Sequence, residues 1–223
     1  MDDQDDLAFF YPCYDTAISI FRDWASPHNL VMGRSFDEGI SDRVSTVSPD
    51  PMVALDEDVH TLNLITGETV EIELPADLVI ADEWTIEFWN YVTIQPSGEA
   101  KFLTQPDCTE GVYIALSSSG YFIWYPDWPY DAVKFETSDL ANSNWYHFSF
   151  INDVRIGTLT IQRYTNTAGY AAPSSFLYSG AHFCEATPIV FNEDTIIPDQ
   201  FVHDFRIWNK AKTKQEIWTN LKK

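Results

Sequence analysis

The chain has 223 residues and a formal net charge of −21, with 34 Asp and Glu against 13 Lys and Arg. This balance argues against nucleic-acid binding, because neutralising phosphates needs a basic surface. Hydrophobic residues make up 45% of the chain and aromatic residues 15%, which predicts one folded domain with a packed core. The sequence contains no apolar run long enough for a membrane span, and its acidic start does not resemble a secretion signal.

Residues 1–27 are predicted to form an acidic and aromatic N-terminal arm, and residues 28–223 the main domain. Within the arm, apolar residues between Asp15 and Trp24 have the spacing of a helix face. The arm either folds back onto its own domain or docks on a neighbouring subunit. The side chains expected to make such docking contacts are aromatic: Phe9, Phe10, Tyr11, Phe21 and Trp24.

From residue 30 onwards, short apolar and aromatic stretches separated by turn residues are typical of β-strands. Residues 60–74 predict a hairpin that turns at Thr66–Gly67. Residues 111–125 predict a second hairpin around the Ser-rich turn 117–120. Together with the stretches at 84–92, 145–151 and 158–164, the sequence predicts roughly ten strands.

Two stretches show the alternation of a strand with two different faces. In residues 84–92 the first face carries Trp84, Ile86, Phe88 and Val92, and the second carries Thr85, Glu87, Trp89 and Tyr91. In residues 201–208 the predicted faces are Phe201, His203, Phe205 and Ile207 against Val202, Asp204, Arg206 and Trp208. A polar turn and a short Lys-rich helix follow this closing strand.

Four stretches resemble the motifs of laminin-G-like, concanavalin A-like jelly rolls, in the same order along residues 30–223. They are LVMGRSFDEG from Leu30, WTIEFW from Trp84, WYHFSF from Trp145 and DFRIWN from Asp204. Arg34 replaces an aromatic residue that is usual in the first motif. The resemblance implies an all-β fold: an antiparallel two-sheet β-sandwich of jelly-roll type, with the N-terminal arm and a short C-terminal helix.

Laminarinase-type glucanases share this fold, and they place catalytic carboxylates on one strand as E-x-D-x-E. The nearest stretch here runs from Glu83 to Glu87 and has Thr85 at its centre, so we expect no enzyme activity and no catalytic residues. A carboxylate inside an aromatic strand is costly unless it is paired. We therefore expect Glu87 to form a partly buried ion pair with Arg206 that locks the sheet.

The aromatic run from Tyr121 to Tyr130 is the best candidate for ligand binding. It contains Trp124 within the predicted strand, and Asp127, Trp128 and Tyr130 in a loop stiffened by proline. Exposed rings in such a loop stack on sugar faces or anchor a protein partner. The alternative is a hydrophobic flap over the end of the sandwich.

The sequence predicts no cofactor. Calcium needs several oxygen ligands from loops, for which three pairs are weak candidates: Asp107 and Glu110, Asp127 and Asp131, or Glu193 and Asp194. The three cysteines have no metal-binding spacing. Two of them, Cys108 and Cys184, could join two loops, but the odd count favours reduced thiols.

These observations predict a non-catalytic recognition or adhesion module that binds a glycan or a protein surface through loops at one end of the sandwich. The alternative is a structural protein, such as a capsid decoration or a tail fibre of a virion, that docks through its arm in a homo- or hetero-oligomeric assembly. Both hypotheses favour an extracellular, cell-surface or virion-associated location.

Overall fold

The computed structural model describes a little over half of the chain, including all of the central strands. The described residues are 6–11, 20–22, 29–31, 44–47, 59–64, 66–67, 69–72, 74, 79–92, 96–106, 108, 112–118, 122–124, 144–165, 169–170, 174–177, 183–184, 187–194 and 200–220.

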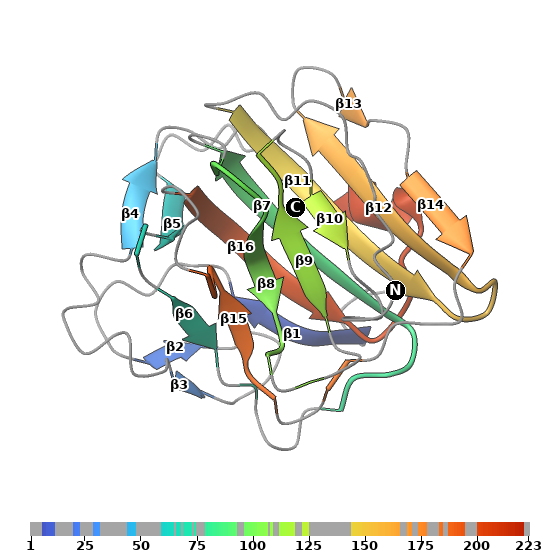
Figure 1. Cartoon of the computed structure of the whole chain (residues 1–223). Helices are drawn as coiled ribbons and strands as arrows, with labels where there is room; N and C mark the ends of the chain where they lie inside the picture. Colours follow the sequence, from blue (N-terminus) through green and yellow to red (C-terminus); the bar gives the residue numbers. More distant parts are fainter. Residues whose placement is uncertain are drawn as a thin grey trace.

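The protein is an all-β sandwich, as predicted: a large and a small antiparallel sheet lie face to face (Figure 1). The large sheet consists of β1 (Leu7–Tyr11), β4 (Val44–Val47), β5 (Val59–Leu64), β7 (Trp84–Val92), β11 (Asn144–Asp153), β12 (Thr158–Thr165), β13 (Gly169–Tyr170), β14 (Ser174–Leu177) and β16 (Gln200–Trp208). The small sheet consists of β6 (Val70–Ile72), β8 (Ala100–Thr104), β9 (Tyr113–Leu116), β10 (Phe122–Trp124) and β15 (Ile189–Phe191). A separate pair is formed by β2 (Ile20–Arg22) and β3 (Asn29–Val31).

Strands far apart in the sequence are neighbours in both sheets. The large sheet has the order β13-β12-β11-β7-β16-β5-β4, with β14 also paired to β12 and β1 to β16. The small sheet has the order β10-β9-β8-β15-β6. The closing strand β16 therefore lies in the middle of the large sheet, between β7 and β5.

The core lies between the two sheets and is rich in aromatic rings. Alternation in β7 is confirmed, because Trp84, Ile86 and Phe88 belong to the core cluster between the sheets, whereas Trp89 packs in a separate cluster. The ring of Phe88 stacks on that of Phe102 from β8, with 5.5 Å between their centroids. Burying one such side chain contributes about 1.5–3 kcal/mol. Since these two rings come from different sheets, their contact holds the two layers together.

The closing strand contains an irregularity that alternation did not predict. His203 lies opposite Trp89 and Arg206 opposite Glu87, with a register shift between them. Asp204 adopts a left-handed backbone conformation, with φ of 59°. Two residues on β16 therefore oppose one on β7, which is a β-bulge.

Because of this bulge, the predicted faces of the closing strand are wrong. The core side carries Val202, Phe205 and Ile207. The register places Phe201, His203, Arg206 and Trp208 on the same side as Glu87 and Trp89. An inserted residue reverses every side chain beyond it, and Asp is one of the few residues that tolerates the left-handed conformation.

The hairpin predicted for residues 60–74 is not formed. The first strand, β5, pairs with β4 and β16 in the large sheet, whereas β6 pairs with β15 in the small sheet. Gly67, with φ of 90°, lies in the turn that carries the chain from one sheet to the other. A turn signal predicts that the chain changes direction, but it does not reveal the partner of each strand. The second predicted hairpin is confirmed as β9–β10.

The beginning of the arm folds back onto its own domain. Strand β1 pairs with β16, and the backbone N–H of Asn209 donates to the carbonyl of Asp6 at 2.8 Å. The helix predicted between residues 15 and 24 is wrong at Ile20–Arg22, which form β2. Short apolar stretches fit helix and strand periods equally well. The backbones of Phe9, Phe10, Tyr11 and Phe21 lie in strands. Trp24 lies outside the described residues, and docking through the arm stays a prediction.

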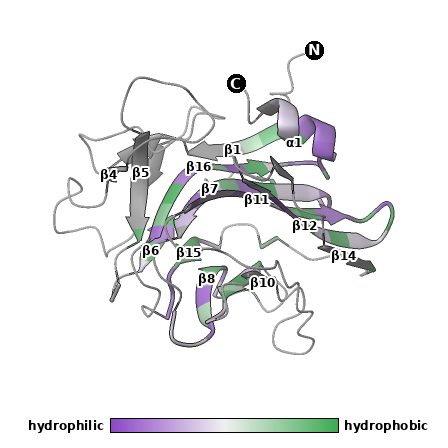
Figure 2. Cartoon of the chain, turned by 90° about the horizontal axis from the view of Figure 1, so that it is seen from above, coloured by the Kyte–Doolittle hydropathy of each residue, from purple (hydrophilic) through white to green (hydrophobic). Residues whose placement is uncertain are grey.

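The C-terminal helix α1 (Lys214–Asn220) packs on the outer face of the large sheet, away from the small sheet (Figure 2). Its first turn is capped by Thr213 and Glu216, which exchange hydrogen bonds between side chain and backbone. Ile217 is fully buried, and the ring of Trp218 lies 5.3 Å from that of Tyr164. The predicted short helix is thus confirmed. It is the one helix among the described residues, and it is too short to cross a membrane.

Candidate functional site

A small pocket of about 50 Å³ lies at one end of the small sheet. Residues of β8 and β9, the segment after β8 and the turn after β15 line it: Lys101, Thr104, Gln105, Pro106, Cys108, Val112, Tyr113 and Glu193. Both polar and apolar groups face the cavity. We refer to it as the Glu193 pocket.

A network around Glu193 provides the charged groups of this pocket. The Lys101 ammonium donates to Glu193 Oε1 at 2.7 Å and lies 3.7 Å from Asp194 Oδ1. The Thr104 hydroxyl donates to Glu193 Oε2, also at 2.7 Å. The side chains of Lys101 and Glu193 are 27% and 26% exposed, so solvent reaches the network. Burial alone lowers the pKa of Lys101, but the hydrogen bond and charge of Glu193, with Asp194, raise it above its usual value.

Tyr113 adds a phenol to the pocket. Burial raises its pKa to about 12, and the negative charges of Asp194, Glu99 and Glu193 act in the same direction. The hydroxyl therefore keeps its proton throughout the physiological pH range and serves as a hydrogen-bond donor as well as an acceptor. The ring itself is 9% exposed.

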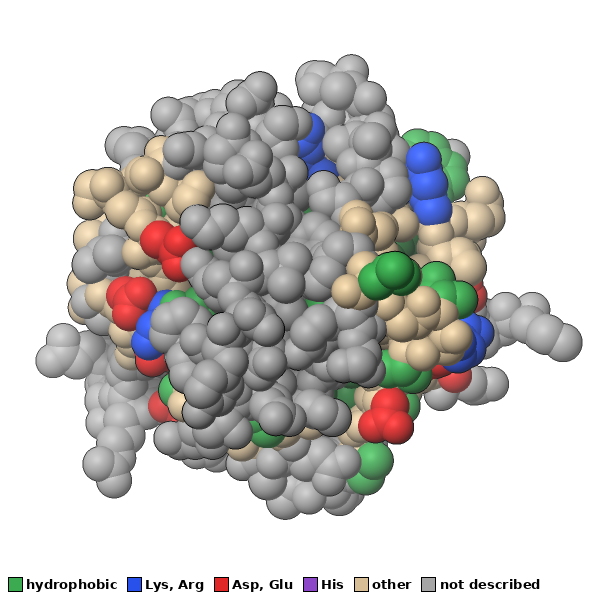
Figure 3. All heavy atoms as spheres, turned by 45° about the vertical axis from the view of Figure 1, so that its right-hand side comes forward, with side chains coloured by type: hydrophobic (Ala, Val, Ile, Leu, Met, Phe, Trp, Pro, Cys, Tyr) green, Lys and Arg blue, Asp and Glu red, His purple; other side chains and the backbone are tan. Residues whose placement is uncertain are grey.

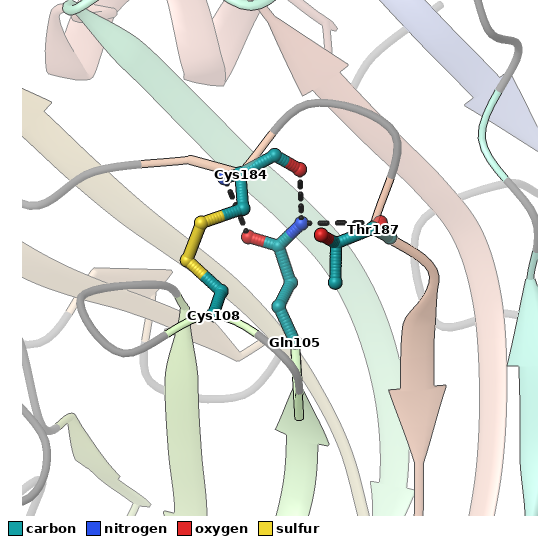
Figure 4. The surroundings of a disulfide bond; sticks show 4 residues. All are labelled: Gln105, Cys108, Cys184 and Thr187. Carbon is teal, nitrogen blue, oxygen red and sulfur yellow. Dashed lines mark hydrogen bonds between the residues drawn. A yellow bond between two sulfur atoms is a disulfide. The ribbon is translucent and has the colours of Figure 1, made fainter.

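A disulfide between Cys108 and Cys184 fixes the rim of the pocket (Figure 4). Their Cα atoms are 6.0 Å apart, within the range typical of disulfides. The Gln105 amide reinforces this connection: its Nε2 donates to the carbonyl of Cys184 at 2.8 Å, and its Oε1 accepts from the Cys184 N–H at 3.1 Å. A longer bond of 3.3 Å reaches the carbonyl of Thr187.

The expectation of reduced thiols is thus wrong for Cys108 and Cys184. The odd cysteine count concealed the pair, which is separated by 76 positions in the sequence. Next to the disulfide, Phe183 packs edge-on against Trp84 of the core, with 6.0 Å between ring centroids. The disulfide and this ring contact together hold the segment before β15 against the sandwich.

The described part of the aromatic run proposed for ligand binding, Phe122–Trp124, forms β10 beside β9, which carries Tyr113 of the pocket. Trp124, the last residue of β10, pairs with Ile114, and Ile114 directly follows Tyr113 of the pocket. Asp127, Trp128 and Tyr130 lie outside the described residues, as does the side chain of Trp124. The structure therefore places the start of the aromatic segment near the pocket, while contacts of its rings stay a prediction.

A second cluster of charged groups surrounds Glu87 on the outer face of the large sheet. Glu87 Oε1 accepts a hydrogen bond of 2.7 Å from Trp208 Nε1. Arg206 Nη1 lies 3.9 Å from the same oxygen, within the distance of an ion pair, while its Nη2 donates to Asp204. Glu87 is only 1% exposed. The Glu87 cluster is thus a network in which tryptophan is the nearest partner of the carboxylate.

Burial dominates the electrostatics of the Glu87 cluster. It raises the pKa of Glu87 above its usual value, against the opposing effects of Lys212, Arg206 and the Trp208 hydrogen bond. His147 Nε2 lies 3.8 Å from Glu87 Oε2, but burial and the charges of Arg206 and Lys212 hold the pKa of this histidine well below its usual value. His147 is therefore neutral at pH 7, and its contact with Glu87 is not an ion pair.

The two glutamates of the glucanase-like stretch have separate environments. Glu83 precedes β7 and pairs with Arg155 at 2.9 Å, whereas Glu87 is buried against Trp208. Retaining hydrolysis needs two carboxyl groups about 5–5.5 Å apart that both face the substrate. A buried Glu87 does not meet this requirement.

The residues proposed as calcium ligands do not form a metal site in the part of the chain that the structure describes. Two of the pairs, Asp107 with Glu110 and Asp127 with Asp131, lie outside the described residues. Glu193 and Asp194 instead pair with Lys101. Among the residues that the structure describes, no group of three or more His, Cys, Asp or Glu gathers in a way that could hold a metal ion.

On the face drawn in Figure 3, the described apolar side chains form small patches among acidic, basic and other polar side chains. In the part of the chain that the structure describes, the exposed large apolar residues are Val79, Val154, Ile156 and Leu177. Scattered exposed apolar side chains are normal on a soluble protein. Among the described residues, the Glu193 pocket is therefore the better candidate for a binding site.

Comparison with known proteins gives similarity in structure only. No family model matches the sequence, and no curated protein matches it either. The fold is similar to the binding domain of botulinum neurotoxin serotype D, with a TM-score of 0.70 and 14% identity over 98% of this chain and 51% of that chain. It is also similar to the binding domain of Paraclostridial Mosquitocidal Protein 1, with a TM-score of 0.68 and 15% identity over 98% of this chain and 52% of that one.

A further similar structure, with a TM-score of 0.67 and 15% identity, covers 98% of this chain and 51% of the other. It comes from work on cell entry of botulinum neurotoxin type C, described as dependent on interaction with two ganglioside molecules. The chain spans about half the length of all three proteins. At these identities the likeness concerns the fold, and it confirms the sandwich architecture predicted from the sequence.

Proposed function

We propose that this protein is a non-catalytic recognition module that binds a glycan or a protein surface through the end of the sandwich that carries the Glu193 pocket. The observation that carries the proposal is the pocket itself. It combines charged, hydroxyl and apolar groups, and a disulfide and the Gln105 amide hold its rim. Fixed polar groups beside apolar surface are typical of binding sites.

The similar structures support the class of function. They are named as binding domains, and among them are the type C toxin linked to two ganglioside molecules and a complex of the serotype DC binding domain with rat synaptotagmin II. These properties belong to whole domains about twice the length of this chain. They favour recognition over catalysis without naming the ligand.

The aromatic segment after β10 supplies the second part of the proposed surface. Trp128 and Tyr130, with Trp124 and Asp127 beside them, are the proposed ligand contacts, because indole and phenol rings stack on sugars and anchor protein partners. The strand before this segment, β10, pairs with β9, which carries Tyr113 of the pocket. Ring stacking and pocket contacts would then act on the same ligand.

The disulfide favours an extracellular or cell-surface location, since disulfides persist in oxidising compartments. Recognition is also favoured over assembly through the arm, because β1 pairs within its own sheet.

The test is a glycan array and a cell-surface binding assay with the whole chain. Trp128→Ala and Tyr130→Ala should each reduce binding at least tenfold. Gln215→Ala, on the exposed surface of α1, is the control and should bind normally. Equal binding by all four proteins would refute the proposed surface, and binding to neither glycans nor cell surfaces would refute the function.

A further inference from the structure

We propose that the Glu193 pocket selects an uncharged, hydroxylated group, namely the edge of a neutral sugar residue, and excludes glycans that present a carboxylate, sulfate or phosphate there. This inference rests on the proposed recognition function and specifies its ligand class. It is carried by the hydrogen-bonding capacity, the charge and the size of the pocket.

The hydrogen-bonding groups of the pocket can bind a sugar hydroxyl. A carboxylate offers about four acceptor positions, and the described contacts of Glu193 use two of them, from Lys101 and Thr104. An ammonium group has three protons; Lys101 donates one to Glu193 at 2.7 Å, and Asp194 Oδ1 lies 3.7 Å from its nitrogen. A sugar hydroxyl donates and accepts at once. It can therefore donate to Glu193 while it accepts from Lys101.

The charge of the pocket disfavours anions. The negative charges of Glu193, Asp194 and Glu99 lie close enough to Tyr113 to raise its pKa. Among the residues that line the described pocket, Lys101 supplies the one positive charge. The protein as a whole carries a net charge of −21. A carboxylate or sulfate entering this site would meet repulsion both locally and at long range.

Cationic ligands are disfavoured for a different reason. Lys101 already lies between the two carboxylates that would attract a positive group. Their charge raises the pKa of Lys101, which keeps it protonated. An incoming ammonium or guanidinium would lie beside a like charge or would have to displace it, whereas a neutral hydroxyl joins the existing network.

The volume of the pocket limits which part of a sugar residue can enter it. Sites for drug-sized ligands occupy roughly 300–1,000 Å³, while this cavity holds about 50 Å³. The space fits a hydroxymethyl group or a pair of hydroxyls. The sugar ring would remain at the rim, where the exposed Pro106 provides apolar surface.

The experiment compares matched neutral and anionic sugars by saturation-transfer NMR and titration calorimetry on the whole oxidised chain. The probes are the methyl β-glycosides of glucose and galactose and the corresponding uronides, in which a carboxylate replaces the hydroxymethyl group. We expect at least one neutral glycoside to bind with millimolar affinity and its uronide to bind at least tenfold more weakly. A tri-lysine peptide tests for a cationic ligand and should not compete.

Single substitutions test whether the glycosides bind in the Glu193 pocket. Glu193→Gln and Tyr113→Phe should each weaken glycoside binding at least fivefold, with thermal unfolding recorded to confirm that both variants fold. Glu83→Gln, which alters a glutamate paired with Arg155 away from the pocket, is the matched control and should bind normally.

Three results would overturn the inference: no binding of any neutral glycoside, equal binding of the uronide, or Glu193-dependent binding of the peptide. If these occur while cell-surface binding remains sensitive to Trp128→Ala, the ligand class is wrong and the recognition function stands. If cell-surface and glycan binding are both absent, the recognition function fails as well.

Discussion

Glu87 and Glu193 have similar partners on opposite sheets but differ in burial. Each carboxylate accepts a hydrogen bond of 2.7 Å and lies near a basic side chain. Glu87 is 1% exposed beneath the C-terminal segment, whereas the Glu193 side chain is 26% exposed. The same chemical groups can therefore stabilise the fold at one place and remain available to a ligand at the other.

The difference follows from the cost of removing charge from water. A buried carboxylate without its partners costs several kcal/mol, whereas an exposed ion pair contributes about 0–1 kcal/mol. Altering the Glu87 cluster should thus affect stability, and altering the Glu193 pocket should affect binding. Unfolding and binding measurements on single variants test this division.

The largest effect is expected for Glu87→Ala. This change leaves the buried Trp208 Nε1 without its acceptor and removes a negative charge beside Arg206 and Lys212. We expect a loss of about 3–5 kcal/mol in the free energy of unfolding, measured by urea denaturation. Glu83→Ala, which removes a more exposed glutamate, should cost less than about 1 kcal/mol. Equal losses would contradict the structural role of Glu87.

Loss of the disulfide should have the next largest effect. For a loop closed over 76 positions, chain entropy predicts a stabilisation of about 4 kcal/mol. The variant with both Cys108→Ser and Cys184→Ser should therefore unfold at lower denaturant concentration and bind glycosides more weakly. Thiol titration of the unfolded, unreduced wild-type protein should detect one thiol of the three cysteines. Detection of three would show that the bond does not form.

The pH dependence of stability should reveal buried His147. Since its pKa is lower in the folded protein than the usual 6.5, the unfolded chain binds the proton more readily below pH 6.5. The contribution of His147 to stability is complete above that pH and is lost as the pH falls, by up to about 1.4 kcal/mol per pH unit.

The raised pKa of Glu87 acts in the opposite direction, because it stabilises the fold at pH values below 4.5 and loses that contribution as the pH rises. The difference between wild type and His147→Gln isolates the histidine. Unfolding free energies at pH 7.0, 6.0 and 5.0 should converge for the two proteins as the pH falls. Parallel curves would show that His147 is not buried in its neutral form.

The sequence predicts the sandwich well because its strands are long and alternate clearly. Alternation predicts that Trp84, Ile86 and Phe88 share one face of a strand, and all three lie in the core between the sheets. Alternation does not reveal the bulge at Asp204, because both faces of this strand carry large apolar residues and the change of phase does not stand out. The turn at Thr66–Gly67 was recognised, but the sheet to which each flanking strand belongs depends on distant partners.

The Glu193 pocket was missed for a related reason. Lys101 and Glu193 are 92 positions apart, and neither belongs to a recognisable motif. Lys101 stands between buried Ala100 and Phe102, and such a charged residue in an apolar strand is the signal that could have drawn attention to it. Its partners became evident only when β8 and β15 were placed side by side.

The smallest change in stability is expected at the pocket, where it provides the sharpest contrast with Glu87. Glu193→Gln keeps the shape of the side chain and removes its charge, and the ion pair that it weakens is partly solvated. The free energy of unfolding should change by less than about 1 kcal/mol. Glycoside binding should nevertheless fall, because the amide offers one acceptor oxygen in place of two. If Glu193→Gln destabilises the protein as much as Glu87→Ala does, the pocket is part of the structural framework, and partial exposure does not separate binding groups from supporting ones.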